Sequence, residues 1–447
     1  MNPKEDIQEI FSKAVERVDP FKMITQNMRL EGDNLVIHYE GKTLQEDLRN
    51  YTKIVVLGIG KASSKMGKAI EEILGQRISM GSVITKYGHG EKLEIIDVIE
   101  AAHPIPDENS IKGAGFLYKL AQEADEKTLI INLVSGGGSA LFSLPAEGIA
   151  LRDIQKMTKV LLDCGADIKE INCIRKHISR VKGGHFARVS YPARMINIIL
   201  SDVIGDRLDT IASGITVADD TTFAQAQGII DKYHIQDKMP PSIVRLIRSG
   251  LAGDVPDTPK KGDPVFKKVT NILLGNNAAA CRAARDHGSS LGYNAYVLTS
   301  SLSGEAREIA RFFTALAKDV DQDLSDFARP ALIVAGGETT VTIRGTGKGG
   351  RNQEMALAFL IDLVESYENF ANIYFLSGGT DGNDGPTDAA GAFVFYEMKD
   401  TIAQLGLNPS EFLENNDSYH FFEQLKGLII TGPTNTNVCD VQLLIVV

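Results

Sequence analysis

The chain has 447 residues, which is long for a single hydrophobic core, so we expect two domains. Hydrophobic residues make up 43% and charged residues 23%, as in soluble globular proteins. The formal net charge of -11 argues against a nucleic-acid partner, which requires an excess of basic residues. We expect a cytoplasmic protein without a membrane partner, because there is no apolar run of ~18 residues, no secretory signal and no CxxC pair.

The predicted elements begin with an amphipathic helix, in which apolar residues recur at helical spacing from Ile7 to Val18. From Lys53 onward, short apolar strands alternate with glycine-rich turns and helices, which predicts a parallel sheet covered on both faces. Residues 238–264 contain five prolines and many charges, as an interdomain region does. The same rhythm then resumes, but "TTVTIRG" alternates apolar and polar residues, which favours a mixed second sheet.

These patterns predict an α/β protein with two domains. We place an N-terminal domain at residues 1–240, a linker at 241–264 and a C-terminal domain at 265–447. The helix within residues 1–30 is left unplaced, and packing on the second domain is one location for it. The sequence does not fix the oligomeric state, and we consider a homodimer.

Four apolar strands end in glycine clusters, in the segments "VVLGIGK", "LVSGGGSA", "IVAGGETT" and "FLSGGTDG". Ligands of open α/β sheets bind outside the carboxyl ends of strands, and glycine lets an anion approach the main-chain N–H groups. Tight turns explain any single cluster equally well, but four clusters in equivalent positions favour anion binding. We therefore predict that phosphates lie on the main chain of Ser135, Gly136, Gly137, Gly138 and Ser139.

Neither familiar phosphate-binding motif fits these turns. Val55 stands five positions before Gly60, and Ala62 follows Lys61, so the P-loop pattern fails. The dinucleotide fingerprint fits Gly58 and Gly60 but then meets Ser63, which argues against a nicotinamide cofactor.

Several cations stand where they could bind an anion. Lys61 follows a strand end at the start of a helix, and Arg351 follows two glycines at the start of another. Arg175 and Lys182 share a cationic helical face in "INCIRKHISRVKGG". A solvated surface cation is the competing explanation for each of these residues.

Acidic residues follow two buried strands, in "SDVIGDRLD" and "GTDGNDGPTDAAGA". Gly385 and Ala392 occupy positions where a calcium loop requires ligands, so a calcium cage fails. Magnesium is usually held by one or two carboxylates together with phosphate oxygens, and Asp202, Asp381 and Asp384 are our candidates for it. Aspartates that bond their own backbone are the alternative. Glycine turns, separate cations and carboxylates together favour phosphoryl transfer.

The ordered motifs resemble those of a known family. "LVSGGGSALFSLP", "HPIPDENS", "INCIRKHISRVKGGHFA", "LSDVIGDRLDTIASGIT", "GGETTVTIRGTGKGGRNQE", "GTDGNDGPTDAAGA" and "TGPTNTNV" are similar to the signature blocks of the class II glycerate kinases, which are glycerate 2-kinases with a C-terminal MOFRL domain. The blocks run in the same order from about Lys53 to Asn437. One departure is Ile215, where the family usually has proline.

The resemblance implies ATP-dependent phosphorylation of D-glycerate, at the 2-hydroxyl, with ATP and Mg²⁺. It implies a Rossmann-like N-terminal α/β/α domain, a MOFRL-type C-terminal α/β/α domain and an active site in the cleft between them. The family's catalytic lysine and arginine fall on Lys61 and Arg351.

From this we hypothesise that Asp202, Asp381 and Asp384 supply the metal ligands, with Asp202 also catalytic. Arg175 or Lys182 would hold the glycerate carboxylate. The alternatives are a nicotinamide-dependent hydroxypyruvate reductase, a name given to some relatives, and a non-catalytic nucleotide-binding protein.

Overall fold

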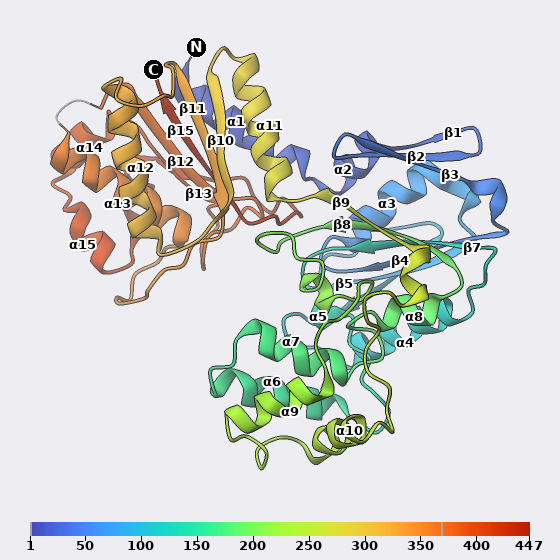
Figure 1. Cartoon of the computed structure of the whole chain (residues 1–447). Coiled ribbons are helices and arrows are strands. Elements are labelled where there is room, and N and C mark those ends of the chain that lie inside the picture. The colour runs from blue at the N-terminus through green and yellow to red at the C-terminus, as the bar shows by residue number, and fades with distance from the viewer. Residues whose placement is uncertain (1, 368–369) are drawn as a thin grey trace. The chain divides into compact units, whose positions relative to one another are not determined.

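The computed structural model describes residues 2–367 and 370–447. The chain divides into two compact units, each described here by itself (Figure 1). The N-terminal unit is Pro20–Leu274, and the C-terminal unit combines Met1–Asp19 with Gly275–Val447. In the part of the chain that is described, no helix is long and apolar enough to cross a membrane.

The N-terminal unit is built on a six-stranded sheet, in which every pairing with an assigned register is parallel, as the sequence predicts. The central strands are buried apolar runs, because helices cover both faces, whereas the two edge strands are partly exposed. In sheet order they are β6 (Ile96–Ala101), β5 (Met80–Lys86), β4 (Lys53–Ile59), β7 (Thr128–Val134), β8 (Arg194–Leu200) and β9 (Val269–Gly275).

Helices α3 (Ser63–Leu74), α4 (Glu108–Gln122) and α8 (His185–Ser190) pack around this sheet, and α2 (Pro20–Asn27) contacts α3 (Figure 1). A small antiparallel sheet joins β1 (Met28–Glu31), β2 (Asn34–Tyr39) and β3 (Lys42–Asp47). Short 3₁₀ segments punctuate the connections, at η1 (Leu48–Asn50), η2 (Gly75–Arg77), η3 (Ile211–Ser213) and η4 (Pro264–Lys268).

A second core lies in the same unit, within a group of helices that we call the helical lobe. Figure 1 shows its members below the sheet: α6 (Leu151–Asp163), α7 (Ile168–His177), α9 (Phe223–Lys232) and α10 (Pro241–Ala252). Its buried residues include Met157, Ile174, Ile230 and Ile247.

The division of the chain differs from the predicted one in two places. Residues 241–264, which we expected to form a linker, begin with helix α10, whose Ile243 and Ile247 are fully buried in the helical lobe. Prolines at the start of a helix do not interrupt it, because the first helical N–H needs no partner. Strand β9 then completes the N-terminal sheet, so the unit extends to Leu274.

The C-terminal unit holds a mixed sheet, as predicted, with β10 and β11 parallel and the remaining pairs antiparallel. The segment "TTVTIRG", whose alternation led to that prediction, follows β11 as a loop and is not one of the strands. In sheet order the strands are β10 (Asn294–Leu302), β11 (Ala331–Gly337), β15 (Asp440–Val446), β12 (Ile373–Gly379), β13 (Gly391–Val394) and β14 (Leu428–Ile429).

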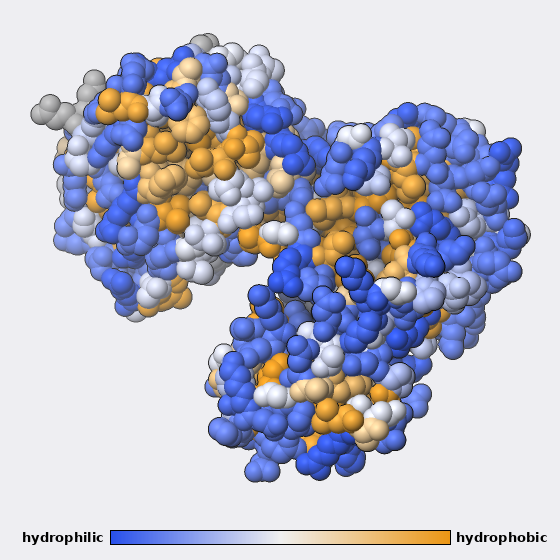
Figure 2. All heavy atoms as spheres, viewed as in Figure 1, coloured by the Kyte–Doolittle hydropathy of each residue, from blue (hydrophilic) through white to orange (hydrophobic). Residues whose placement is uncertain are grey.

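The N-terminal helix α1 (Pro3–Arg17) packs in the C-terminal unit, against α11 (Asn277–Ser290). The same unit contains α12 (Ala306–Asp321), α13 (Arg351–Ser366), α14 (Met398–Leu405), α15 (Pro409–Glu414) and α16 (Ser418–Leu425). On the face shown in Figure 2, hydrophilic residues predominate and apolar residues form separate patches.

Candidate functional site

The glycine-rich loop after β7 is the centre of the site in the N-terminal unit. Gly137 has φ +84°, a left-handed conformation that glycine adopts without strain, and the short helix α5 (Gly138–Leu141) begins directly after it. Across residues 2–367 and 370–447, the N–H groups of Gly137 and Ser139 have no hydrogen-bond acceptor. Bare donors of this kind suit an anion, so anion binding by this loop stays a prediction.

The turn after β4 packs onto this loop. The N–H of Lys61 donates to the carbonyl of Gly136 at 2.9 Å, and the N–H of Ala62 donates to Oγ of Ser135 at 3.0 Å. A Cβ built on Gly137 would lie 3.3 Å from Cγ of Lys61. The parallel pairing of β4 with β7 brings the two strand ends together, and the lysine side chain therefore runs beside the glycine loop.

Two further side chains lie against the loop. The carboxylate of Asp202, which follows β8, packs so closely on Gly136 that a Cβ there would overlap it. His103 lies on another side, where a Cβ on Gly137 would be 3.0 Å from its Cδ2 atom. Burial and the neighbouring Lys61 and Lys86 lower the pKa of His103 to about 4, so this imidazole is neutral near pH 7.

A strained segment supports the far side of the loop. Ala212 and Ser213, which are not glycines, have φ of +49° and +59°. The hydroxyl of Ser213 lies 2.9 Å from that of Ser139 and donates to Oδ1 of Asn172 at 3.2 Å. Strain of this kind persists only where the surroundings over-determine it, and it is common at functional sites.

Lys182 is 5% exposed, and its ammonium group donates to the carbonyls of Ser139 at 2.6 Å and Phe142 at 3.0 Å. Burial, together with the charge of Arg175, lowers its pKa to about 7. Lys182 therefore donates to two carbonyl oxygens within and just after α5, and these hydrogen bonds hold the loop in its conformation.

Arg175 lines a cavity of about 940 Å³ in the N-terminal unit. Gly137, Ser139 and Lys182 line the same cavity. The predicted helical face shared by Arg175 and Lys182 is wrong, because α7 ends at His177 and Lys182 follows in a loop. Burial lowers the pKa of the Arg175 guanidinium. Among the described residues this guanidinium has no hydrogen-bond or ion-pair partner. Its N–H donors are therefore available to an anionic ligand.

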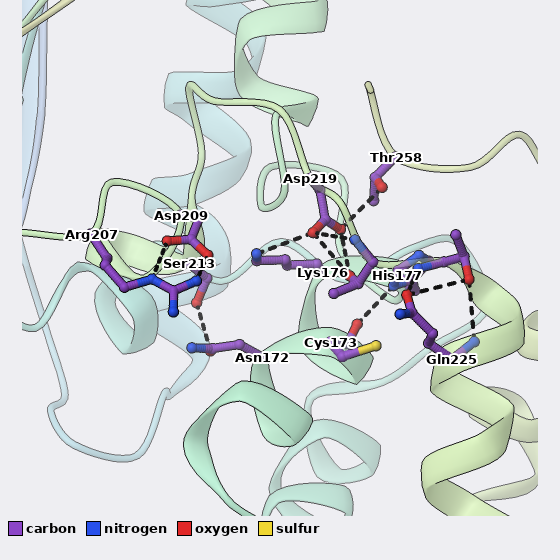
Figure 3. A network of polar contacts seen from close by, with 12 residues as sticks. Asn172, Cys173, Lys176, His177, Arg207, Asp209, Ser213, Asp219, Gln225 and Thr258 are labelled. Carbon is purple, nitrogen blue, oxygen red and sulfur yellow. Dashed lines mark hydrogen bonds and ion pairs between the residues drawn. The ribbon is translucent and has the colours of Figure 1, made fainter. Parts of the chain in front are cut away.

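A polar network holds α7, which carries Arg175, in the helical lobe (Figure 3). Nζ of Lys176 lies 3.2 Å from Oδ1 of Asp219, and both side chains are almost fully buried. Asp219 also accepts a hydrogen bond from Thr258 Oγ1 at 3.0 Å. His177 contacts Asp257 at 2.8 Å. These contacts fix the end of the helix that faces the cavity.

In the C-terminal unit, Arg351 is the first residue of α13 and is held by two carboxylates. Its Nε and Nη2 donate to Asp440 at 2.6 and 2.9 Å, and its Nη1 lies 2.8 Å from Glu338. Burial alone would lower the pKa of the guanidinium, but the bonds to Asp440 outweigh it and raise the pKa. Arg351 is thus a charged, oriented group whose side chain remains about one-third exposed.

Asp440 is completely buried beneath Arg351 at the start of β15. Burial raises the pKa of its carboxyl to about 6, even though Arg351 opposes the shift. We did not predict a role for this residue, because "CDVQLLIVV" is typical of an ordinary buried strand. Its only signal in the sequence is an aspartate within an apolar run.

The two predicted acids in this unit have different environments. Both carboxylate oxygens of Asp384 accept hydrogen bonds from the main chain and side chains of Asn352 and Gln353, between 2.8 and 3.2 Å. Asp384 therefore caps the N-terminus of α13. Asp381 is half-buried, and its Oδ1 accepts from the N–H of Asn383 at 3.1 Å.

A magnesium ion bound chiefly by nucleotide phosphates fits these surroundings. Within the described residues, no three His, Cys, Asp or Glu side chains are grouped to form a complete cage of protein ligands. Asp202 lies beside the glycine loop, where its carboxylate could complement phosphate oxygens around such an ion. The carboxylate of Asp384 already accepts four hydrogen bonds, so this residue fits the role of a magnesium ligand least well.

The structure thus brings most of the predicted N-terminal residues together. Lys61, Asp202 and the glycine loop form one cluster, and Arg175 and Lys182 line the adjoining cavity. Arg351, Asp381 and Asp384 belong to the C-terminal unit. Sequence reasoning did not assign roles to His103, Glu338 and Asp440. His103 and Asp440 are far along the chain from the residues they contact, whereas Glu338 stands shortly before its partner Arg351.

Comparison with known proteins identifies both halves of the chain. Residues 6–248 match the family model DUF4147, described as a domain of unknown function, and residues 331–440 match the MOFRL family. The D-glycerate 2-kinase of Thermotoga maritima is 42% identical over 88% of this chain and 90% of its own length. The glycerate 2-kinase of Pyrococcus horikoshii is 40% identical over 99% and 98%. The crystal structure of a Thermotoga maritima glycerate kinase superposes with a TM-score of 0.88 at 39% identity, covering 99% of each chain.

Proposed function

The chain belongs to the glycerate 2-kinase family, in which a DUF4147 domain precedes a MOFRL domain, and we propose that it transfers the terminal phosphoryl group of ATP to the 2-hydroxyl of D-glycerate. In this reaction the 2-hydroxyl oxygen of glycerate forms a bond to the terminal phosphorus of ATP, and the bond between that phosphorus and the oxygen of the departing ADP breaks. Such transfers depend on positioning and on stabilisation of negative charge more than on a strong base.

The observation that carries the proposal is the glycine loop with Lys61 beside it. The N–H groups of Gly137 and Ser139 are available to phosphate oxygens, and the β4 turn is bonded to the loop through the main chain of Lys61. Bare main-chain donors in a loop with a cation beside them favour phosphate binding. The adjoining cavity adds the guanidinium of Arg175 for an anionic group of the substrates, such as the glycerate carboxylate.

Lys61 and Arg351 are assigned, as in the family resemblance, to charge stabilisation on the transferred group. Arg351 is pre-oriented by Asp440 and Glu338, which lowers the entropy that it loses on binding. Lys182 supports the loop through the carbonyls of Ser139 and Phe142, so its contribution to substrate binding is indirect.

Magnesium would be held by Asp202, with Asp381 as a second candidate ligand. The bound ion would neutralise charge on the phosphate oxygens. In that arrangement Asp202 orients the ion relative to the loop, and Asp384 acts by fixing the helix that presents Arg351.

A nicotinamide-dependent reductase is the less favoured function. The dinucleotide fingerprint needs its second glycine free for the pyrophosphate. Here Gly60 packs against Ser135 so closely that a Cβ would overlap it, and the position of the third glycine is Ser63, whose hydroxyl donates to Ile84 O at 2.9 Å. The turn after β4 is therefore used for contact with the glycine loop.

The direct test is an assay with the purified protein, ATP, Mg²⁺ and D-glycerate. We expect ADP release that depends on glycerate and on the metal. Oxidation of NADH with hydroxypyruvate, without ADP release from glycerate, would overturn the proposal in favour of the reductase. Binding of ATP without turnover of glycerate would instead favour a non-catalytic protein.

Two finer expectations stay predictions. We predict a cytoplasmic location, because all four cysteines are free thiols and the cytosol keeps thiols reduced. A homodimer is to be tested by light scattering of the purified protein.

A further inference from the structure

The 940 Å³ cavity is far larger than a three-carbon acid requires. Cavities of roughly 300–1,000 Å³ bind ligands of the size of a nucleotide or a drug. Gly137 and Ser139, whose N–H groups lack acceptors among the described residues, form one end of this cavity. A ligand with phosphates on this loop would therefore extend into the cavity.

Two segments that carry apolar side chains form walls of the cavity. One is the segment Pro104–Pro106 that follows His103, and the other is helix α6 of the helical lobe, through Ile154 and Leu162. The two walls are connected by a hydrogen bond from Nε2 of Gln155 to the carbonyl of Pro106, at 3.0 Å, and both residues line the cavity.

Each wall exposes a large apolar side chain. Ile105 and Leu162 both line the cavity, and both are 62% exposed. Flat apolar ligands such as nucleobases gain most from surfaces of this kind, whereas a carboxylate or phosphate gains nothing from them. Five charged residues also line the cavity: Lys156, Lys159, Asp163, Arg175 and Lys182.

We infer that this cavity binds the nucleoside part of the phosphoryl donor, with its base between Pro104–Pro106 and helix α6. The inference rests on the proposed kinase function, and it adds a binding subsite to it. The triphosphate then runs from the base to the glycine loop, and Arg175 lies along its path. Ile105 and Leu162 bind the nucleoside, whereas the loop binds the phosphates.

Two probes separate these contributions. ADP carries a nucleoside and phosphates, and inorganic tripolyphosphate carries phosphates alone. The variants Ile105→Asn and Leu162→Asn reduce the apolar surface of the walls without adding charge. Ile168→Asn and Leu251→Asn are matched controls, because these residues are 56% and 46% exposed and do not line the cavity.

Calorimetric titration of each full-length variant measures binding of both probes. We expect each cavity variant to weaken ADP binding at least about threefold while tripolyphosphate binding changes less than about twofold. The controls should leave both affinities unchanged. Thermal unfolding checks that the variants remain folded, as expected for exposed positions.

Equal affinity for ADP in the cavity variants and the wild type would overturn the inference. A parallel loss of ADP and tripolyphosphate binding would overturn it too, as would a wild type that binds neither probe. Turnover of glycerate is measured separately. If the wild type does not turn over glycerate but binds ADP, and the cavity variants weaken that binding, the kinase proposal is contradicted and the subsite is supported. Normal turnover with unaltered ADP binding contradicts the subsite alone.

Discussion

Lys61 and Arg351 carry the same sign of charge but are held in opposite ways. Among the described residues the ammonium group of Lys61 has no hydrogen-bond or ion-pair partner, and its backbone alone is fixed to Gly136. Arg351 is bonded to Asp440 and Glu338. A lysine ammonium group without a partner acts as a point charge that can move with a phosphate. A hydrogen-bonded arginine presents its planar guanidinium in a fixed orientation.

Replacing Lys61 with methionine should therefore remove catalysis and leave the fold intact. We expect kcat for glycerate phosphorylation to fall by at least about a hundredfold, because a cation that acts on the transferred group is lost. The unfolding temperature should stay close to that of the wild type. Steady-state kinetics and circular dichroism measure both quantities, and a kcat within about tenfold of the wild type would contradict the assignment.

Asp440 links the activity to pH through Arg351. Its carboxyl has a pKa of about 6, raised by burial, and it must be ionised to hold the guanidinium. Activity should fall as the pH drops through about 6, and Asp440→Asn should lower kcat and lose this acid limb. A pH profile of kcat for both proteins provides the measurement. An unchanged acid limb in the variant would show that another group titrates.

The same carboxyl affects stability with the opposite sign. Because its pKa in the folded protein is raised above the unfolded value, its stabilising contribution is present at low pH and is lost as the pH rises through about 6. Asp440→Asn should therefore gain stability relative to the wild type between pH 5 and pH 7. Urea unfolding at these two pH values tests the sign, and a relative loss of stability would contradict it.

At the scale of elements, the glycine loop and the helical lobe have separate tasks. The loop offers its main chain to a ligand, and the lobe carries Arg175 on α7 and forms one wall of the cavity through α6. The strained residues Ala212 and Ser213 connect them, since Ser213 contacts both Ser139 of the loop and Asn172 of α7.

Gly137→Ala tests the glycine loop, and Gly165→Ala is its matched control. Gly137 and Gly165 have similar φ of +84° and +78°, but only Gly137 faces His103 and Lys61, while Gly165 faces open space. Alanine should cost about 1 kcal/mol of stability at Gly165, and more at Gly137, where its Cβ also presses on His103 and Lys61. We expect a raised KM for ATP in Gly137→Ala alone. Equal effects of the two variants on KM would show that the loop does not bind the nucleotide.

The buried pair Lys176–Asp219 should be necessary for the stability of the helical lobe. Lys176→Met leaves a buried carboxylate without its cation, and we expect a loss of about 3 kcal/mol in the free energy of unfolding. The control is Lys119→Met, which breaks an exposed pair of 3.8 Å and should change stability by less than about 0.5 kcal/mol. Denaturant unfolding that shows similar losses in both variants would contradict this role.

For the whole molecule, the sequence predicts the local features and misses those made by distant contacts. The strand ends at Ile59 and Val134, and the glycine turns after them, follow from apolar runs and backbone chemistry. The sequence does not predict helix α10, because its prolines suggest a linker, and the place of α1 against α11 depends on packing between segments far apart in the chain. Asp440 acquires its role only when β15 inserts between β11 and β12.

The site residues divide in the same way. Lys61, Arg351 and the glycine loop are predictable because they lie at element boundaries with a clear local signal. The role of Lys182 is set by the carbonyls of Ser139 and Phe142, about 40 residues away, and no spacing in the sequence encodes that contact. Similarly, the four donors to Asp384 come from the start of α13.

The central claim is that this protein phosphorylates the 2-hydroxyl of D-glycerate with ATP. Proton-coupled phosphorus NMR of the product formed with ATP, Mg²⁺ and D-glycerate tests it most directly. A phosphate on the 2-oxygen couples to one proton and gives a doublet, whereas a phosphate on the 3-oxygen couples to two and gives a triplet. We predict a doublet that is absent with Lys61→Met, and a triplet or no new phosphate ester would contradict the claim.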